Sequence, residues 1–311
     1  MRTLSSFLIL VALLCSATPS RAQDAVRIAV SVRNVVLMPY YFAKDKGYFD
    51  REGLRAEIIQ MRSNLQVAGV ASGELDFMSG VGTAIDAVRK GASLKVIAVL
   101  YRAPLFSLLS GSAIKTPKDL LGKKVGVSRI GSESHNAAVW MLTQNGVDVR
   151  KVTFIQTGST IVSMIGLQQN SLDASILSPP FTGEMVVQGF KVLAKTSDVA
   201  ESPFNGMATS VDKLRSRPER IRKSLKALLE SFRRIKQDRS GTVDYIRQSF
   251  KVSERIAENS YNEIREVMLD DMIMPEERLQ KALEGPYSRS EGEKSLSINE
   301  VVDYSILRSL R

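Results

Sequence analysis

Apolar and polar residues alternate from position 26 to position 32, and this period of two predicts a β-strand. A polar turn at residues 31–34 follows. Pro39 then stands near the start of an aromatic-rich helical segment that Gly47 and Gly53 bring to an end. Residues 54–59 form a second predicted strand. This order places a polar loop and a helix start at the carboxyl end of the first strand, which is where open α/β sheets bind ligands.

Short apolar runs and helical segments continue to alternate beyond this unit. Predicted strands at residues 75–78 and 94–100 flank a helix that opens at a glycine turn, residues 80–83. Further strands are predicted at residues 124–128, 152–156, 174–177 and 190–193, with helices at 135–144 and 161–168 between them. From residue 216 onward the apolar positions follow helical spacing. We therefore predict an α/β fold of two mostly parallel β/α units with a helical C-terminal segment.

The first residues have the pattern of an export signal. Arg2 precedes a nearly continuous apolar run at residues 4–14, and Ser20-Arg21-Ala22 is a small-x-small cleavage motif. We predict a signal peptide at residues 1–22, cut after Ala22. The alternative is an uncleaved membrane anchor, which the shortness of the apolar run disfavours.

The position of the single cysteine excludes thiol chemistry from the exported chain. Cys15 is the only cysteine and lies inside the predicted leader, and the Leu14 before it does not fit a lipidation site. The exported chain would therefore have no thiol. Disulfides, thiolate catalysis and cysteine metal sites are excluded from it.

The chain carries a formal net charge of +10, which falls to +8 when Arg2 and Arg21 leave with the leader, because residues 1–22 contain no acidic residue. The basic residues are dispersed and the protein is predicted to be exported, so nucleic acid is a poor explanation of the charge. A positive field raises the local concentration of small anions. Solubility and contact with an anionic surface explain the charge equally well.

The sequence shows no motif of an enzyme. His135 is the only histidine and stands in the first turn of a predicted helix, where capping or packing is its usual role. A G-x-S-x-G elbow, a P-loop and paired cysteines are all missing from the sequence. We therefore predict no catalysis, no cofactor and no metal site.

Several segments together resemble one family. The chain resembles the periplasmic substrate-binding proteins of ABC importers in the nitrate, sulfonate and taurine group, whose fold family includes binders of thiamine-pyrimidine precursors. The segments that carry the resemblance are PYYFAKDKGYFDREG at residues 39–53, ASGELD at 71–76, DLLGKKVGV at 119–127, Gly131-Ser132 before a helix, and residues 172–180. Their order and spacing are more specific than any one of them.

The resemblance implies a type II binding protein with two lobes and a hinged ligand cleft. One lobe would hold residues 23–107 and 206–311, and the other would hold residues 108–205. Strands near residues 105–109 and 207–211 would form the hinge. The protein would be a periplasmic monomer that closes over a small ligand and delivers it to a permease in the inner membrane.

Two glycine-rich helix starts are candidate ligand contacts. Gly80, Gly82 and Thr83 open one helix, and the residues that open the other are Gly131, Ser132 and Ser134. Unpaired backbone N–H groups at such starts bind anions. The resemblance places both loops in the cleft, whereas the plainer interpretation is a glycine turn with a helix cap. Glu133 would repel an anion if it faced the cleft, or would accept a hydrogen bond from an amine or a ring N–H.

Loops after predicted strands supply further candidates, which are Ser31, Arg33, Asn34, Arg102 and Arg129. An arginine there would pair in bidentate fashion with a carboxylate, sulfonate or phosphonate. Alternatively, each arginine is solvated or pairs with an acidic residue of the protein. From these loops and the two helix starts we predict a small organic or inorganic anion as the ligand, such as a sulfonate, a carboxylate or nitrate.

The stiff segment at residues 178–181 ends a predicted strand. Ser178 and Pro180 would border the ligand, and Phe181 would stack on it, although a place in the core or on the surface explains Phe181 equally well. An aromatic or pyrimidine-like ligand is therefore the alternative to an anion, and a sensor subunit for a membrane receptor is the alternative to a transport component. The fold-related pyrimidine precursor synthase uses a cysteine-rich motif, which the exported chain would lack.

Overall fold

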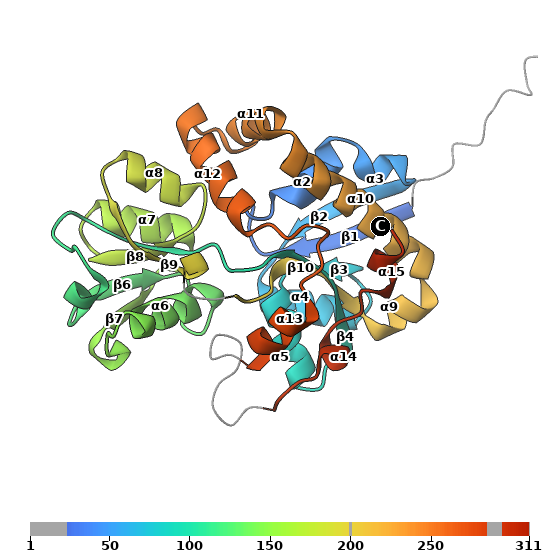
Figure 1. Cartoon of the computed structure of the whole chain (residues 1–311), viewed down its shortest axis with the longest axis horizontal. Coiled ribbons are helices and arrows are strands. Elements are labelled where there is room, and N and C mark those ends of the chain that lie inside the picture. The colour runs from blue at the N-terminus through green and yellow to red at the C-terminus, as the bar shows by residue number, and fades with distance from the viewer. Residues whose placement is uncertain (1–23, 199–200, 285–293, 311) are drawn as a thin grey trace, which may run out of the picture.

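A computed structural model describes residues 24–198, 201–284 and 294–310. The predicted signal peptide lies outside the described residues. The described chain forms two α/β bodies, each built on one five-stranded sheet (Figure 1). The α/β class with two sheets and flanking helices is therefore confirmed.

The first sheet has the strand order β2-β1-β3-β10-β4. Its strands are β1 (Asp24–Val30), β2 (Leu54–Gln60), β3 (Phe77–Met78), β4 (Leu94–Tyr101) and β10 (Phe204–Ser210). The strands β1, β2 and β3 are parallel, in a register that pairs Asp24 with Leu54 and Ile28 with Phe77. By contrast, β10 runs antiparallel to both of its neighbours. The helices α2 (Met38–Asp45), α3 (Tyr48–Arg51), α4 (Ser63–Ala71) and α5 (Val81–Arg89) connect the first four strands.

The second sheet repeats this arrangement with the order β7-β6-β8-β5-β9. Its strands are β5 (Ser107–Ser110), β6 (Lys124–Val127), β7 (Thr153–Gln156), β8 (Ala174–Leu177) and β9 (Lys191–Lys195), and β5 is the strand antiparallel to its neighbours. Three helices, α6 (Glu133–Gln144), α7 (Thr160–Gln168) and α8 (Phe181–Val187), cover it, with short 3-10 turns at Pro117–Leu120, Val149–Lys151 and Thr196–Asp198. Separate apolar clusters lie on its two faces.

The chain passes from the first sheet to the second between β4 and β5, and it returns between β9 and β10. We predicted crossing strands near residues 105–109 and 207–211. In the structure, β5 pairs within the second sheet and β10 within the first, so each passage lies just before the strand in question. The first passage comprises residues 102–106.

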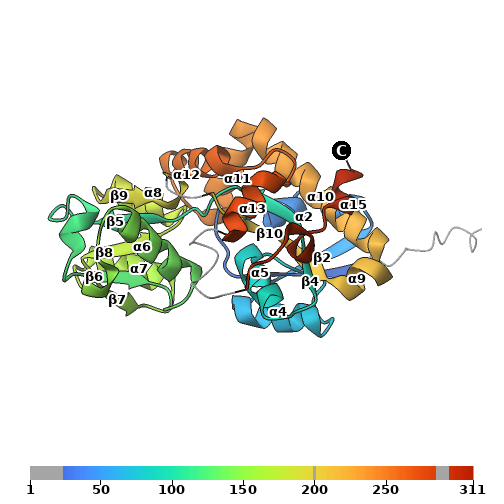
Figure 2. The same ribbon diagram turned by 60° about the horizontal axis from the view of Figure 1, so that its bottom comes forward.

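The C-terminal third is helical, as the spacing predicts, and packs on the first sheet. It contains α9 (Val211–Ser216), α10 (Pro218–Gln237), α11 (Arg239–Phe250), α12 (Glu254–Val267), α13 (Glu276–Glu284), α14 (Ile298–Val301) and α15 (Ser305–Arg308). One of these helices, α12, extends to the second body and lies beside α8 in both views (Figures 1 and 2). A Cβ atom at Gly183 of α8 would lie 3.4 Å from Ile256 Cγ2. Among the described helices, we find none that is long and apolar enough to cross a membrane.

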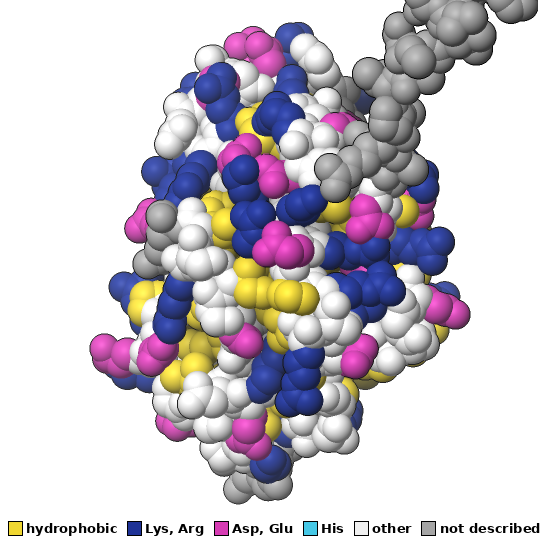
Figure 3. Space-filling model, turned by 90° about the vertical axis from the view of Figure 1, so that its right-hand side faces the viewer, with side chains coloured by type: hydrophobic (Ala, Val, Ile, Leu, Met, Phe, Trp, Pro, Cys, Tyr) yellow, Lys and Arg dark blue, Asp and Glu magenta, His cyan; other side chains and the backbone are white. Residues whose placement is uncertain are grey.

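Charges are mixed over the surface of the first body. On the face shown in Figure 3, Lys and Arg side chains are interspersed with Asp and Glu. Many charged side chains of the first body are paired, for example Lys226 with Glu52 at 2.6 Å and Arg233 with Asp271 at 3.0 Å. This dispersion on that face agrees with the even spread of basic residues along the sequence.

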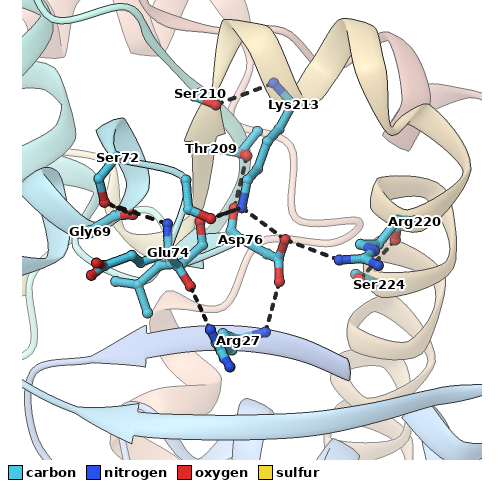
Figure 4. A network of polar contacts seen from close by, with 12 residues as sticks. Arg27, Gly69, Ser72, Glu74, Asp76, Thr209, Ser210, Lys213, Arg220 and Ser224 are labelled. Atoms are coloured by element: carbon cyan, nitrogen blue, oxygen red, sulfur yellow. Dashed lines mark hydrogen bonds and ion pairs between the residues drawn. The ribbon is translucent and has the colours of Figure 1, made fainter. Parts of the chain in front are cut away.

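A buried ion pair fastens α9 to the first sheet (Figure 4). The ammonium of Lys213 donates to the carbonyls of Gly73 (3.0 Å) and Leu75 (2.6 Å) and lies 2.9 Å from Asp76 Oδ1. The other carboxylate oxygen of Asp76 accepts from the Arg27 N–H of β1 at 2.9 Å. This network joins β1, the loop before β3 and the first C-terminal helix.

Replacing Lys213 with Met should therefore destabilise the fold, because Asp76 would stay buried without its closest cation. The expected loss is about 3 kcal/mol in the free energy of unfolding, measured by chemical denaturation. Lys90→Met, at an exposed lysine that caps α5, is the matched control. Equal stability of the two variants would contradict this account of the ion pair.

Candidate functional site

Four loops that carry predicted ligand contacts follow parallel strands at their carboxyl ends. They follow β1 and β3 in the first sheet and β6 and β8 in the second sheet. The loops after β3 and β6 lead directly into α5 and α6. The helix starts on both sheets thus lie at the sheet edge where the sequence pattern places them.

The start of α5 meets the start of α6 from the other body. A Cβ atom at Gly82, in the first turn of α5, would lie 3.4 Å from Glu133 Oε1, and Glu133 is the first residue of α6. The predicted residues Gly80 and Thr83 belong to the same turn as Gly82, whereas Ser132 and Ser134 flank Glu133. The structure therefore brings the two predicted helix starts together, with a carboxyl group between them.

Glu133 is half-buried at this contact. Burial, and secondarily the nearby Asp86 carboxylate of α5, raise the pKa of the Glu133 carboxyl to about 7 from its ordinary 4.5. In the part of the chain that the structure describes, Glu133 has neither a hydrogen bond nor an ion pair through its side chain. The sequence left open whether Glu133 faces the cleft, and the structure places its carboxyl against α5.

The serines of the second body bond to one another. Ser134 Oγ lies 2.7 Å from Ser128 Oγ and accepts from the Ser128 N–H at 3.0 Å. Ser132 Oγ donates to the Arg129 carbonyl at 2.6 Å. Ser128, which directly follows β6, was not among the predicted contacts. These hydrogen bonds hold the loop before α6 in a compact conformation.

His135 packs in the same loop. Gly131, at φ +77°, donates its N–H to His135 Nδ1 at 3.3 Å, and the imidazole lies edge-on to Phe154 with 4.8 Å between ring centroids. Burial lowers the pKa of His135. The ring is thus a packing element, as its position in the sequence predicts. Among the described residues, no group of His, Asp or Glu gathers in a way that would hold a metal ion.

Two buried polar side chains beside α5 were missed by the sequence analysis. Gln66 is fully buried, its Nε2 donates to the Met61 carbonyl at 3.0 Å, and its Oε1 has no partner among the described residues. A Cβ atom at Gly80 would lie 3.8 Å from that Oε1. Ser79 is also fully buried, with an Oγ that has no partner in the described chain. In the sequence, Ser63 and Gln66 have the spacing of a capping box, a pattern that does not reveal the burial of Gln66.

The loop after β1 holds Ser31, Arg33 and Asn34. Asn34 is buried, and its Oδ1 accepts from the Leu37 N–H at 3.0 Å, which shapes the turn into α2. The exposed Arg33 places its guanidinium 4.5 Å from the centre of the Tyr41 ring. Ser31 is exposed. These contacts hold the loop on its own body.

The other two predicted arginines belong to different loops. Arg102 stands in the first passage between the sheets, with its Nη1 3.9 Å from Glu201 Oε1. Arg129 is exposed in the loop before α6. Arg102 thus has an acidic partner on the protein itself, which was the alternative to a contact with the ligand.

The segment after β8 is buried. Ser178 and Pro180 are buried, the peptide bond between Pro179 and Pro180 is cis, and the Ser178 carbonyl accepts from the Thr182 N–H at 3.3 Å. Phe181 is half-buried and packs against the apolar cluster on the α7–α8 face of the second sheet. Its ring contributes to this cluster whether or not it also borders a ligand.

The two sheets, their strand order and the facing helix starts define the periplasmic binding protein fold. Residues 34–239, well over half of the chain, match the family described as NMT1/THI5 like, and the chain belongs to this family. The resemblance to the binding proteins of ABC importers is therefore confirmed for family and fold.

Similar proteins bind different ligands. The riboflavin-binding protein RibY of Chloroflexus aurantiacus is 27% identical over 259 residues, which are 73% of this chain and 71% of the relative. The periplasmic aliphatic sulphonate binding protein SsuA from Escherichia coli has a similar structure, with a TM-score of 0.67 and 20% identity over 79% of this chain and 85% of that chain. The desulfurization enzyme DszB also has a similar structure, with a TM-score of 0.68 and 14% identity over 92% of this chain and 98% of that chain.

Replacing Glu133 with Gln tests the electrostatics of the contact. Folding raises the pKa of this carboxyl from 4.5 to about 7, so the protonated form is favoured in the folded protein. The wild type therefore loses stability as the pH rises from about 4.5 to about 7, where the carboxyl ionises in the folded state. Glu133→Gln does not titrate, so its melting temperature relative to the wild type should be higher at pH 8 than at pH 5. The measurement is thermal unfolding at both pH values. If the melting temperatures of variant and wild type differ by the same amount at both pH values, the pKa of the Glu133 carboxyl is not raised by its surroundings.

Proposed function

We propose that this protein is the periplasmic ligand-binding component of an ABC importer, and that it captures a small molecule between its two bodies and delivers it to a membrane permease. The observation that carries the proposal is the meeting of the α5 and α6 starts, which belong to different sheets. A ligand held there contacts both bodies at once. Family membership and the binding proteins among its relatives support the same function.

The two bodies would act as lobes, with residues 23–107 and 206–311 in one lobe and residues 108–205 in the other. The two passages between the sheets are the proposed hinge, because closure needs only a few residues that change their backbone angles. The proposed contacts with the ligand are the predicted ones. They are Ser31, Arg33, Asn34, Gly80, Gly82, Thr83, Arg102, Arg129, Gly131, Ser132, Ser134, Ser178, Pro180 and Phe181.

The remaining predictions complete the proposal. The leader at residues 1–22 would direct export, and the exported protein would act as a monomer without catalysis, cofactor or nucleic acid. Since DszB shares the fold and is an enzyme, the absence of catalysis rests on the sequence motifs rather than on the fold. The alternative role, a sensor subunit for a membrane receptor, would use the same cleft.

A thermal-shift titration tests the proposed binding. The panel contains nitrate, taurine, MOPS, an aromatic acid, an aminopyrimidine and riboflavin. A ligand that binds only the folded state stabilises it by about 2.7 kcal/mol at a hundred times its Kd, so the melting temperature should rise with the concentration of at least one probe. If no probe raises the melting temperature at millimolar concentration, the proposed function is contradicted.

A further inference from the structure

Three side chains around the first turn of α5 form what we call the acceptor cluster: Gln66, Ser79 and Glu133. Gln66 Oε1 lies near Gly80, Glu133 Oε1 lies near Gly82, and Ser79 directly precedes Gly80. Two of the three come from the first body and one from the second. A ligand bound between the two helix starts would therefore lie close to these side chains.

Gln66 offers an oxygen, not an N–H. Its Nε2 is engaged by the Met61 carbonyl, and this bond fixes which end of the amide is free. The free Oε1 is fully buried and unpartnered among the described residues. A buried acceptor without a donor is costly, so this oxygen is suited to a ligand that brings an N–H or O–H group.

Glu133 offers a carboxyl without a cation. No described residue pairs with it. The titratable group that faces it from the packed helix is Asp86, which has the same charge sign and itself lies 3.1 Å from Arg89 Nη1. His135 lies two residues further along α6, and its Nδ1 is occupied by the Gly131 N–H. The positive end of α5 attracts anions, but the protein itself supplies a carboxyl to that end.

Two of the three arginines predicted to favour an anion have other partners on the protein, whereas Arg129 is exposed in the loop before α6. Arg33 lies over Tyr41, and Arg102 lies beside Glu201. An anionic group at the start of α5 would lie beside the Glu133 carboxylate, and like charges at close range repel. The local charge balance at α5 therefore opposes the predicted anion.

We propose that the ligand presents N–H donors to the acceptor cluster, and that Glu133 is the residue that selects such ligands over anions. This inference rests on the proposed function and narrows the ligand to molecules with an amide, imide, amidine or amino-heterocycle edge. Above its raised pKa of about 7, the Glu133 carboxyl is charged, and a charged carboxylate accepts such a bond more strongly than a neutral amide does. It also repels a sulfonate or nitrate.

Calorimetric titration of the wild type, Glu133→Gln and Glu74→Gln at pH 8, above the raised pKa of Glu133, tests the inference. Riboflavin is a neutral probe with an imide N–H, benzamidine is a cationic probe with N–H donors, and MOPS and nitrate are the anions. We expect the wild type to bind riboflavin or benzamidine and to bind neither anion. Glu133→Gln should weaken that binding about tenfold or more. The control Glu74→Gln, at an exposed carboxylate, should keep the affinity for the same probe within about twofold of the wild type.

Ser79→Ala is a second variant that should fold well, because it removes a buried hydroxyl that has no partner in the described structure. It should weaken the binding of the N–H donor probe while leaving the melting temperature of the free protein near that of the wild type.

The outcomes separate the two proposals. Binding of MOPS or nitrate by the wild type, or an unchanged affinity of Glu133→Gln for the N–H donor probes, overturns this inference and leaves the binding function intact. Binding of no probe contradicts both. Tighter binding of benzamidine than of riboflavin indicates that the N–H donor of the ligand belongs to a cationic group. Tighter binding of riboflavin indicates that it belongs to a neutral group.

Discussion

A carboxyl group of the second body lies against the first turn of a helix in the first body, and the arrangement of the cleft depends on this contact. Parallel strands direct their carboxyl ends, and the helix starts that follow them, to one edge of each sheet. The contact between Glu133 and the turn at Gly82 shows that the two edges face each other. The absence of a side chain at Gly82 allows this approach, because a Cβ atom there would already touch the carboxyl.

Some buried polar groups have hydrogen-bond partners on the protein and stabilise the fold, whereas others have none among the described residues and are available to a ligand. Lys213 and Asp76 are buried, form an ion pair and also hydrogen-bond to backbone groups, so they stabilise the first body. The serines before α6 and Asn34 before α2 are satisfied locally. Gln66 Oε1 and Ser79 Oγ are buried without partners in the described chain, and both lie beside the helix start that Glu133 reaches. Buried polar atoms left unpartnered in this way fit the polar part of a ligand site.

Much of the fold was predictable because local patterns determine it. Strand alternation, glycine turns and helical stripes located most elements, and the resemblance identified the family. The antiparallel direction of β5 and β10 was not predictable from apolar runs, which carry no information about strand direction. The contact between α8 and α12 joins residues far apart in the sequence, such as Gly183 and Ile256. For the site, the sequence located the helix starts. It did not show that Arg33 stacks on Tyr41 or that Gln66 is buried, since both depend on tertiary packing.

The central claim, that the two bodies close over a ligand, is tested most directly by a distance measurement between them. The only native cysteine is Cys15 in the predicted leader, so Lys90→Cys at the end of α5 and Gln144→Cys at the end of α6 give two exposed labelling positions, one on each body. Spin labels there, measured by double electron–electron resonance, report the separation with and without the probe that raises the melting temperature. The account predicts that the probe shifts the distribution to a single, narrower set of distances. An identical distribution in both samples would contradict closure over the ligand.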